Sequence, residues 1–344
     1  TFNKQVHDEY EIIDVLGSGS IAQVYLIKDK NTNENKVMKI IHPNTRREIL
    51  NFHKIFKFIF CFPCIRKKIH TILPFDLNEF IISFYKQCSF IEEANNLLYY
   101  KCLYKKNKYL IIPDLYVVSE DILIMSYENG ESFDTIQFSE YNYDKTISIL
   151  VAFINENLLY NNYSHGDLHK GNWKIKNEDN IYKIIIYDFG FCFSTREKSD
   201  VVNDIHDIIE LYDTNNKTDC EYNKLFSIFK KSVTNSTDEI IKNYMDLHID
   251  ELKYNSMDPY KIINHIINIA VENELLAHHI TMQTLILGIQ NESFAEKCSR
   301  SSVFREADLK YKMLNSNLQA INFCKTNDIF LNYSKILEEK IKNY

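Results

Sequence analysis

Two short stretches of sequence decide the predicted fold: Ser164-His165-Gly166-Asp167-Leu168-His169-Lys170-Gly171-Asn172 and Asp188-Phe189-Gly190. The first follows an amphipathic pattern over residues 144–160 that predicts a helix, and the second ends a β-branched run over residues 181–187 that predicts a strand. Carboxylate and amide oxygens are the ligands that hard cations such as Mg²⁺ prefer. We therefore predict that Asn172 and Asp188 bind the metal and that the carboxylate of Asp167 acts on a substrate.

A glycine-containing hairpin and a strand lysine precede these stretches. Residues 9–16, 22–28 and 36–41 are typical of strands, and the third carries Lys39. The backbone N–H groups of such a hairpin can lie over the phosphates of ATP, while one ammonium group reaches the α- and β-phosphates. A plain glycine hairpin is the alternative interpretation. The predicted nucleotide-binding loop consists of Gly17, Ser18, Gly19, Ser20, Ala22 and Val24, with Lys39 as the phosphate-binding cation.

Glycine and proline are scarce, with 7 and 5 occurrences in 344 residues. Because the composition has lost these residues generally, we expect those that remain to lie where the backbone requires them. Those in the motifs are Gly17, Gly19, Gly166, Gly171 and Gly190.

Two helices are expected after the third strand. Thr45 and Glu48 have the spacing of a capping box, and this helix would bury an apolar stripe of Ile49, Phe52, Phe56 and Phe60. The second helix is predicted to run from Asp76 to about Cys102, with Glu93 off its apolar stripe and available to pair with Lys39.

Strands are expected at residues 109–119 and 121–127, where the chain would pass to a second lobe. Met125 and Tyr127 would then line the adenine site. Phosphoryl transfer needs a carboxylate at the acceptor and oxygen ligands that hold Mg²⁺ against the phosphates. The order of the motifs therefore predicts an α+β, bilobal, protein-kinase-like fold. Its small β-rich N-lobe would comprise residues 1–126, and its larger helical C-lobe would comprise residues 127–344.

Six segments together resemble the UbiB/ADCK (aarF-domain) atypical protein-kinase-like family over about residues 9–195: Ser20-Ile-Ala-Gln-Val24, Lys39-Ile-Ile-His-Pro43, Glu93-Ala-Asn95, Ile122-Leu-Ile-Met125, His165-Gly-Asp-x-His-x-Gly-Asn172 and Asp188-Phe-Gly190. The resemblance implies binding of Mg-ATP and an ATPase or unorthodox kinase activity. In family members this activity is connected with ubiquinone and other isoprenoid lipid metabolism. Lys39 would hold the phosphates, Glu93 would orient Lys39, and Asp167 would be the base.

The sequence also departs from this family. Family members carry an N-terminal extension with a Lys-x-Gly-Gln signature, and we expect the present sequence to begin after it. The family loop is rich in alanine, whereas this loop has Gly17 and Gly19. Gln87 and Ser89 stand where the family has Glu-x-Asp, and Lys170 stands where it has proline.

Three interpretations of function remain, and the first is an ATP-dependent atypical kinase or ATPase of the UbiB/ADCK type. Residues 191–199 leave little room for a peptide-docking segment, which favours a small-molecule or lipid acceptor, or water, over a protein substrate. A small-molecule phosphotransferase of the aminoglycoside or choline kinase type has a similar His-Gly-Asp loop. A nucleotide-binding pseudokinase that acts as a switch for a partner protein is the third interpretation.

Composition limits the partners and the compartment. The net charge of −7 argues against nucleic acid as a partner. Eight scattered cysteines favour reduced thiols in an intracellular, cytoplasmic location. The apolar run over residues 55–65 is too short for a transmembrane segment, although it could contact a membrane surface.

Overall fold

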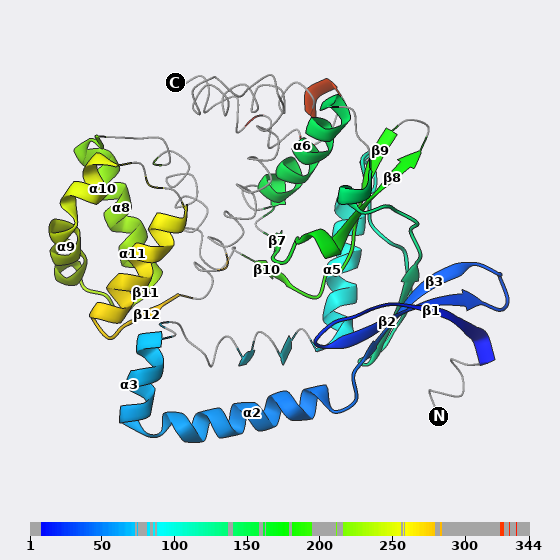
Figure 1. Cartoon of the computed structure of the whole chain (residues 1–344), viewed down its shortest axis with the longest axis horizontal. Coiled ribbons are helices and arrows are strands. Elements are labelled where there is room, and N and C mark those ends of the chain that lie inside the picture. Colours follow the sequence, from blue (N-terminus) through cyan, green and yellow to red (C-terminus); the bar gives the residue numbers. More distant parts are fainter. Residues whose placement is uncertain are drawn as a thin grey trace. The chain divides into compact units, whose positions relative to one another are not determined.

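A computed structural model gives a mixed α+β fold, with a β-rich N-terminal sheet and a helical C-terminal part (Figure 1). It describes residues 8–72, 74, 81–82, 85–86, 88–136, 140–157, 161, 163–178, 181–194, 211, 216–255, 257, 259–278, 283, 324–326, 330 and 335. The chain divides into two compact units. The first unit comprises Thr1–Ile55, Ile81–Ser139 and Asp167–Cys192, and the second comprises Phe56–Phe80, Glu140–Gly166 and Phe193–Tyr344. The lobe boundary expected near residue 126 stays a prediction.

An antiparallel sheet in the order β1-β2-β3-β6-β5 dominates the first unit. Its strands are β1 (Tyr10–Ser18), β2 (Ala22–Asp29), β3 (Asn35–Ile41), β5 (Leu115–Val118) and β6 (Ile122–Ser126). β3 is central, and Lys39 pairs with Val24 on one side and with Leu123 on the other. The buried side chains of Ile27 and Met38 belong to the core of this sheet. Lys39 therefore projects from a strand that is held on both edges.

A three-stranded sheet carries the motif loops. Its strands are β4 (Leu110–Ile111), β8 (Trp173–Glu178) and β9 (Ile181–Ile186), in the order β4-β9-β8. The single strand expected over residues 109–119 was wrong, because β4 pairs in parallel with β9 whereas β5 pairs with β6. Pro113 lies between β4 and β5 and has no N–H group to donate to a ladder. The chain changes sheets at this proline.

Helix α5 (Phe90–Leu103) packs against β5 and β6. The predicted helix from Asp76 to Cys102 was wrong in its continuity, because Ser89 is extended, with φ −116° and ψ 113°. The Nε of Arg46 donates to the carbonyl of Cys88 at 2.8 Å, and its Nη1 lies 2.7 Å from Asp121 Oδ1. These bonds fix where α5 begins. Asp76 and Glu79 lie outside the described residues.

Helix α2 (Thr45–Phe60) begins at the predicted residue but differs in its contacts. The hydroxyl of Thr45 donates to the carbonyl of His42, and the N–H of Glu48 donates to the carbonyl of Asn44, so the predicted capping box was wrong. The predicted core stripe was also wrong. None of the α2 residues is buried, and Phe52 is 58% exposed, because in the described part of the chain no element covers this face completely.

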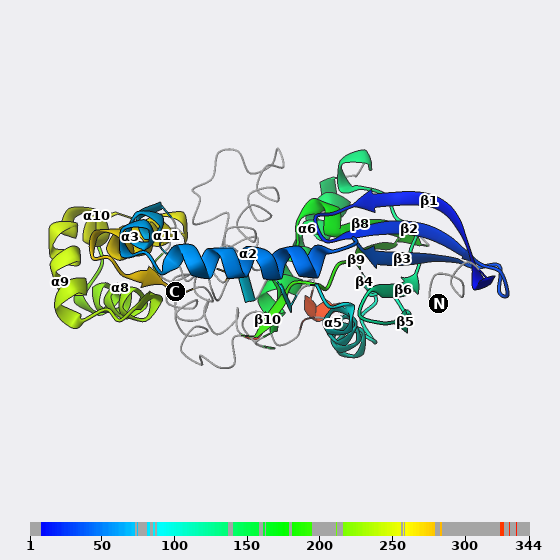
Figure 2. The same ribbon diagram turned by 90° about the horizontal axis from the view of Figure 1, so that it is seen from below.

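Helices make up most of the described part of the second unit. They are α3 (Pro63–Ile72), α6 (Glu140–Glu156), α8 (Asp219–Ser232), α9 (Asp238–Leu247), α10 (Ile249–Tyr254) and α11 (Pro259–Glu272). The short strands β7 (Tyr163–His165), β10 (Cys192–Ser194), β11 (Val233–Thr234) and β12 (Leu276–Ala277) complete the assignment. Helices α8 to α11 enclose one apolar core, and α3 lies beside α11 (Figure 2). Within the described ranges, no helix has the length and hydrophobicity that crossing a bilayer requires.

Candidate functional site

The first unit places the strand lysine between two carboxylates. Lys39 Nζ lies 2.5 Å from Glu93 Oε1 and 3.0 Å from Asp188 Oδ1. Lys39 is 7% exposed and Glu93 3%, whereas the side chain of Asp188 is 46% exposed. The strand, the helix and the turn after β9 thus meet at one ammonium group, and the Asp188 side opens to solvent.

One face of α5 holds the Asp-Phe-Gly turn. Glu93, Asn96 and Tyr100 are spaced three and four residues apart, so they lie on the same side of the helix. Asn96 Nδ2 donates to the buried carbonyl of Phe189 at 2.8 Å, and the rings of Tyr100 and Phe189 are 5.2 Å apart. Sequence reasoning missed Asn96. Its spacing from Glu93 was the signal that could have found it.

Backbone geometry at the turn brings Asp188 to the lysine. Asp188 has φ 56°, in the left-handed region that few non-glycine residues occupy. A Cβ atom at Gly190 would lie 3.3 Å from Asp188 Oδ1 and 3.5 Å from Glu93 Oε2. A side chain at Gly190 would therefore crowd the carboxylate of Asp188, whereas its contact with Glu93 would be an ordinary one. Gly190 is therefore favoured at this position by lack of room for a side chain and not by an unusual φ.

The three charged groups are not balanced. Burial disfavours the charged form of Lys39, but the attraction of Asp188 and Glu93 outweighs burial and raises the pKa of Lys39, so the ammonium stays protonated. Burial raises the pKa of Glu93, and the attraction of Lys39 only partly opposes this. One cation facing two carboxylates leaves an excess negative charge, which a further cation at the half-exposed Asp188 would neutralise.

The loop with Asp167 and Asn172 is tied to the same turn. Asn172 Nδ2 donates to the carbonyl of Asp167 at 2.8 Å, and the N–H of Tyr187 donates to the carbonyl of Asn172 at 2.8 Å. The N–H of Gly171 donates to His169 Nδ1, so the neutral imidazole carries its proton on Nε2. That Nε2 is 3.7 Å from Asp167 Oδ2, which is too long for a hydrogen bond. Asp167 and Asn172 thus share a loop that adjoins Asp188.

The donor set suits a magnesium ion that also has phosphate ligands. The hydrogen bond from Asn172 Nδ2 fixes the amide, and its Oδ1 has no hydrogen-bond partner within the described part of the chain. Among the described residues, no group of three or more His, Cys, Asp or Glu side chains could hold a metal ion. Mg²⁺ is usually bound by one or two protein carboxylates together with substrate phosphates. Asn172 and Asp188 fit that pattern.

The predicted phosphate loop is the turn between β1 and β2. The N–H of Gly19 donates to the carbonyl of Ala22 at 2.9 Å, and Gln23 Nε2 donates to the carbonyl of Gly17 at 3.1 Å. The described glycines all have negative φ, so the expectation that backbone conformation requires them was wrong for this loop. An added Cβ at Gly17 would meet no atom within 4 Å. The loop therefore has free space above it. Across the hairpin, Ser18 pairs with Gln23 and Gly17 pairs with Val24.

The predicted adenine site lies at the end of β6. Met125 is buried and Tyr127 is half-buried. The phenol of Tyr187 donates to the carbonyl of Glu128 at 2.9 Å, and burial raises the pKa of this phenol, which keeps it a donor. The N–H of Ser126 donates to the carbonyl of Asp114. Two backbone groups of the expected adenine-binding segment are thus already bonded to protein.

Residues 1–222 match the ABC1 atypical kinase-like domain. The chain belongs to this family. The match confirms the family that the motifs indicated. The probable serine/threonine-protein kinase abkC of Dictyostelium discoideum is 30% identical over 168 residues, which make up 48% of this chain and 24% of that relative. The present chain thus spans about a quarter of the relative's length.

The fold is also confirmed by a solved structure. A complex of Rv3197 with erythromycin from Mycobacterium tuberculosis is similar at a TM-score of 0.51 and 13% identity, over 81% of this chain and 78% of that chain. A likeness at this identity concerns the fold alone. It agrees with the kinase-like α+β architecture of an ABC1 domain.

One departure of this ABC1 chain has a structural counterpart. Lys170, which stands where the motif of the family has proline, forms an ion pair with both carboxylate oxygens of Asp134, at 2.9 and 2.8 Å. Asp134 lies in the 3₁₀ helix η1 (Phe133–Thr135). Both side chains are more than half exposed, so the pair contributes little to stability. The pair attaches the Asp167 loop to the segment after β6.

Proposed function

We propose that this ABC1 domain binds Mg-ATP at the Lys39, Glu93 and Asp188 site and transfers the γ-phosphoryl group. The observation that carries the proposal is the position of Lys39 Nζ, 2.5 Å from Glu93 and 3.0 Å from Asp188. This arrangement fixes an ammonium group beside a half-exposed carboxylate, as a phosphate-binding lysine and a magnesium ligand require. Family membership supports the same assignment.

Each residue has a distinct role in the proposed reaction. Lys39 binds the α- and β-phosphates, and Glu93 orients Lys39. Asn172 and Asp188 hold the cation. Mg-ATP supplies the transferable phosphoryl group when it is bound. The carboxylate of Asp167 orients the acceptor hydroxyl and takes its proton.

The nucleotide itself would lie between the β1–β2 turn and the end of β6. The free space above Gly17 supports close approach of phosphates to that turn. Met125 and Tyr127 would contact the adenine. The acceptor that we propose is a small molecule, a lipid or water. This part of the proposal rests on the shortness of residues 191–199, of which 195–199 lie outside the described residues.

Binding can be tested by thermal unfolding with Mg-ATP and Mg-ADP. A ligand that binds only the folded state stabilises it by RT ln(1 + [L]/Kd), about 2.7 kcal/mol at a hundredfold excess over Kd. We expect a shift for the native chain and none for Lys39→Met. Lys36→Met is the matched control, since Lys36 is also buried on β3 and pairs with Asp29 at 2.6 Å. Equal shifts in the two variants would contradict the site.

Turnover is tested separately, by phosphate release and by transfer to a panel of lipids, phenols and amino alcohols. Asp167→Asn should retain the nucleotide-induced shift and lose turnover. Phosphorylation of an amino alcohol would favour the small-molecule phosphotransferase. A nucleotide-induced thermal shift without any turnover would favour the pseudokinase that acts as a switch. Efficient peptide phosphorylation would overturn the proposed acceptor class.

A further inference from the structure

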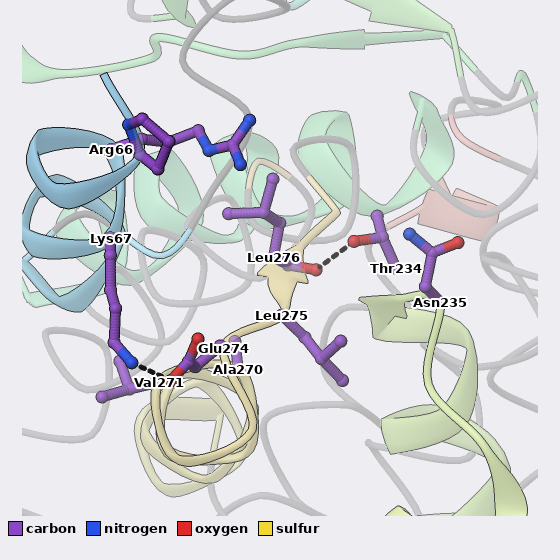
Figure 3. A pocket seen from close by; sticks show the side chains of 10 residues that line it. Arg66, Lys67, Thr234, Asn235, Ala270, Val271, Glu274, Leu275 and Leu276 are labelled. Carbon is purple, nitrogen blue, oxygen red and sulfur yellow. Dashed lines mark hydrogen bonds and ion pairs between the residues drawn. The ribbon is translucent and has the colours of Figure 1, made fainter. Parts of the chain in front are cut away.

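A second concave site lies wholly within the second unit, and the proposed function makes no use of it. It is a pocket of about 420 Å³, within the usual size range of small-molecule sites. Helix α3 forms one wall, the turn after β11 forms another, and the end of α11 with β12 forms the third (Figure 3).

Hydrogen bonds within the protein hold the walls of the pocket in place. Thr234 pairs with Leu276 across the two-stranded sheet, and the hydroxyl of Thr234 donates to the Leu276 carbonyl at 3.0 Å. The N–H of Leu275 donates to the carbonyl of Ala270 at 2.8 Å, which closes the end of α11. Ala270 belongs to the buried core of the unit. A ligand would therefore meet walls that are already ordered.

The charge in the pocket is unevenly compensated. Lys67 forms an ion pair with Glu274, so these two charges offset each other. Arg66, one residue earlier on α3, extends toward Leu276 in Figure 3. Its guanidinium has no hydrogen bond or ion pair with any of the residues that the structure describes. Arginine remains protonated in proteins and presents a planar fork that matches carboxylate and phosphate groups. Among its described lining residues, the pocket thus has one uncompensated cation, Arg66.

The opposite side of the pocket is apolar. Val271, Leu275 and Leu276 line it and are only half-buried, which leaves hydrocarbon surface open to a ligand. An inorganic anion alone would leave this surface in contact with water. A neutral apolar ligand would leave the guanidinium of Arg66 without a partner. Only a ligand with both features matches both walls.

We propose that this pocket binds an amphiphilic anion. The carboxylate or phosphate head group would pair with Arg66, and a short hydrocarbon group would contact Val271, Leu275 and Leu276. Asn235 lies on the wall formed by the turn after β11, and its amide would face the head group from there. This inference does not depend on nucleotide binding in the first unit.

The test uses the full chain and four probes in calorimetric titrations. Octyl phosphate and octanoate carry both features, inorganic phosphate lacks the hydrocarbon group, and octanol lacks the charge. We expect saturable binding of the two octyl anions and at least tenfold weaker binding of the other two probes. Equal binding of inorganic phosphate or of octanol would overturn the proposal, and so would the absence of binding by the octyl anions.

Variants locate the binding. Arg66→Gln should weaken octyl phosphate binding at least tenfold, whereas Lys68→Gln should not, since Lys68 is equally exposed on α3 but does not line the pocket. Asn235→Asp adds a negative charge at the other wall and should also weaken binding; asparagine and aspartate both tolerate the φ of 57° at this position. Circular dichroism confirms that each variant is folded. Equal loss in Arg66→Gln and Lys68→Gln, or displacement of the probe by Mg-ADP, would contradict the assignment.

Discussion

Replacing Lys39 by methionine should destabilise the first unit strongly, even without nucleotide. The substitution leaves Glu93 buried at 3% exposure and next to Asp188 with no cation between them. Removing one partner of a buried ion pair typically costs about 3–5 kcal/mol. Because the Asp188 side chain is 46% exposed and water screens it, we expect about 3 kcal/mol, at the lower end of that range.

A second substitution at the same site should reverse part of this loss. If the loss comes from the uncompensated carboxylate, Glu93→Gln should relieve it, so Lys39→Met combined with Glu93→Gln should recover at least half of the lost stability. Urea denaturation followed by tryptophan fluorescence measures this. Trp173 is the only tryptophan, is 2% exposed and lies on β8 in the same unit as the site. Its signal therefore reports on that unit.

Additive losses of stability would contradict a coupling between Lys39 and Glu93. If the double variant loses the sum of the two single losses, Lys39 and Glu93 are not coupled energetically. Lys36→Met is again the control, because its partner Asp29 lies away from the Asp188 turn and Glu93→Gln should not rescue it.

Three further predictions concern other parts of the chain. Asn96→Leu removes the 2.8 Å amide hydrogen bond to the buried Phe189 carbonyl, so it should cost about 0.5–1.5 kcal/mol and weaken nucleotide binding. Exposed Asn95→Leu should do neither, and urea denaturation and thermal shifts compare the two variants. Gly19→Ala should raise the free energy of unfolding by about 0.4–1 kcal/mol. Gly130→Ala should lower the free energy of unfolding by about 1–3 kcal/mol, since the new Cβ would lie 2.6 Å from Ile185 Cδ1. A fall for Gly19→Ala or a rise for Gly130→Ala would contradict the geometry. Burial lowers the pKa of His265 below 6.5, so stability should fall as pH drops below about 6.5, and melting temperatures from pH 5 to 7.5 should show a smaller fall for His265→Gln.

Local patterns predicted much of the fold and the contacts of the site. The strands of the N-terminal sheet follow from β-branched runs. The pairing of Lys39 with Glu93 was predicted, because a buried strand lysine needs a carboxylate partner. The predicted position of Glu93 off the apolar stripe was wrong, because Glu93 lies on the buried face of α5 with Leu97 and Tyr100. The position of Asp188 follows from its place at the end of β9. These features depend on residues close to one another in sequence, or on chemistry that only one partner could satisfy.

The errors have a different origin. The stripe of α2 has the spacing of a core helix, but periodicity shows only that a face is apolar and does not show what covers it. The continuity of the second helix failed because Arg46, more than forty residues earlier, bonds the carbonyl of Cys88. The change of sheets at Pro113 depends on the parallel pairing of β4 with β9. Contacts between residues far apart in the sequence cannot be predicted from local sequence patterns.

The bonds of Arg46 also bear on how ligand binding would begin. They fix the first turn of α5 relative to the sheet, so Glu93 lies opposite Lys39. Proteins that must first swing such a helix inward bind more weakly, by the fraction of molecules that are already competent. Here Lys39 Nζ lies 2.5 Å from Glu93 Oε1, so α5 already has the position that the lysine requires. Nucleotide binding to this arrangement would therefore require no inward movement of α5.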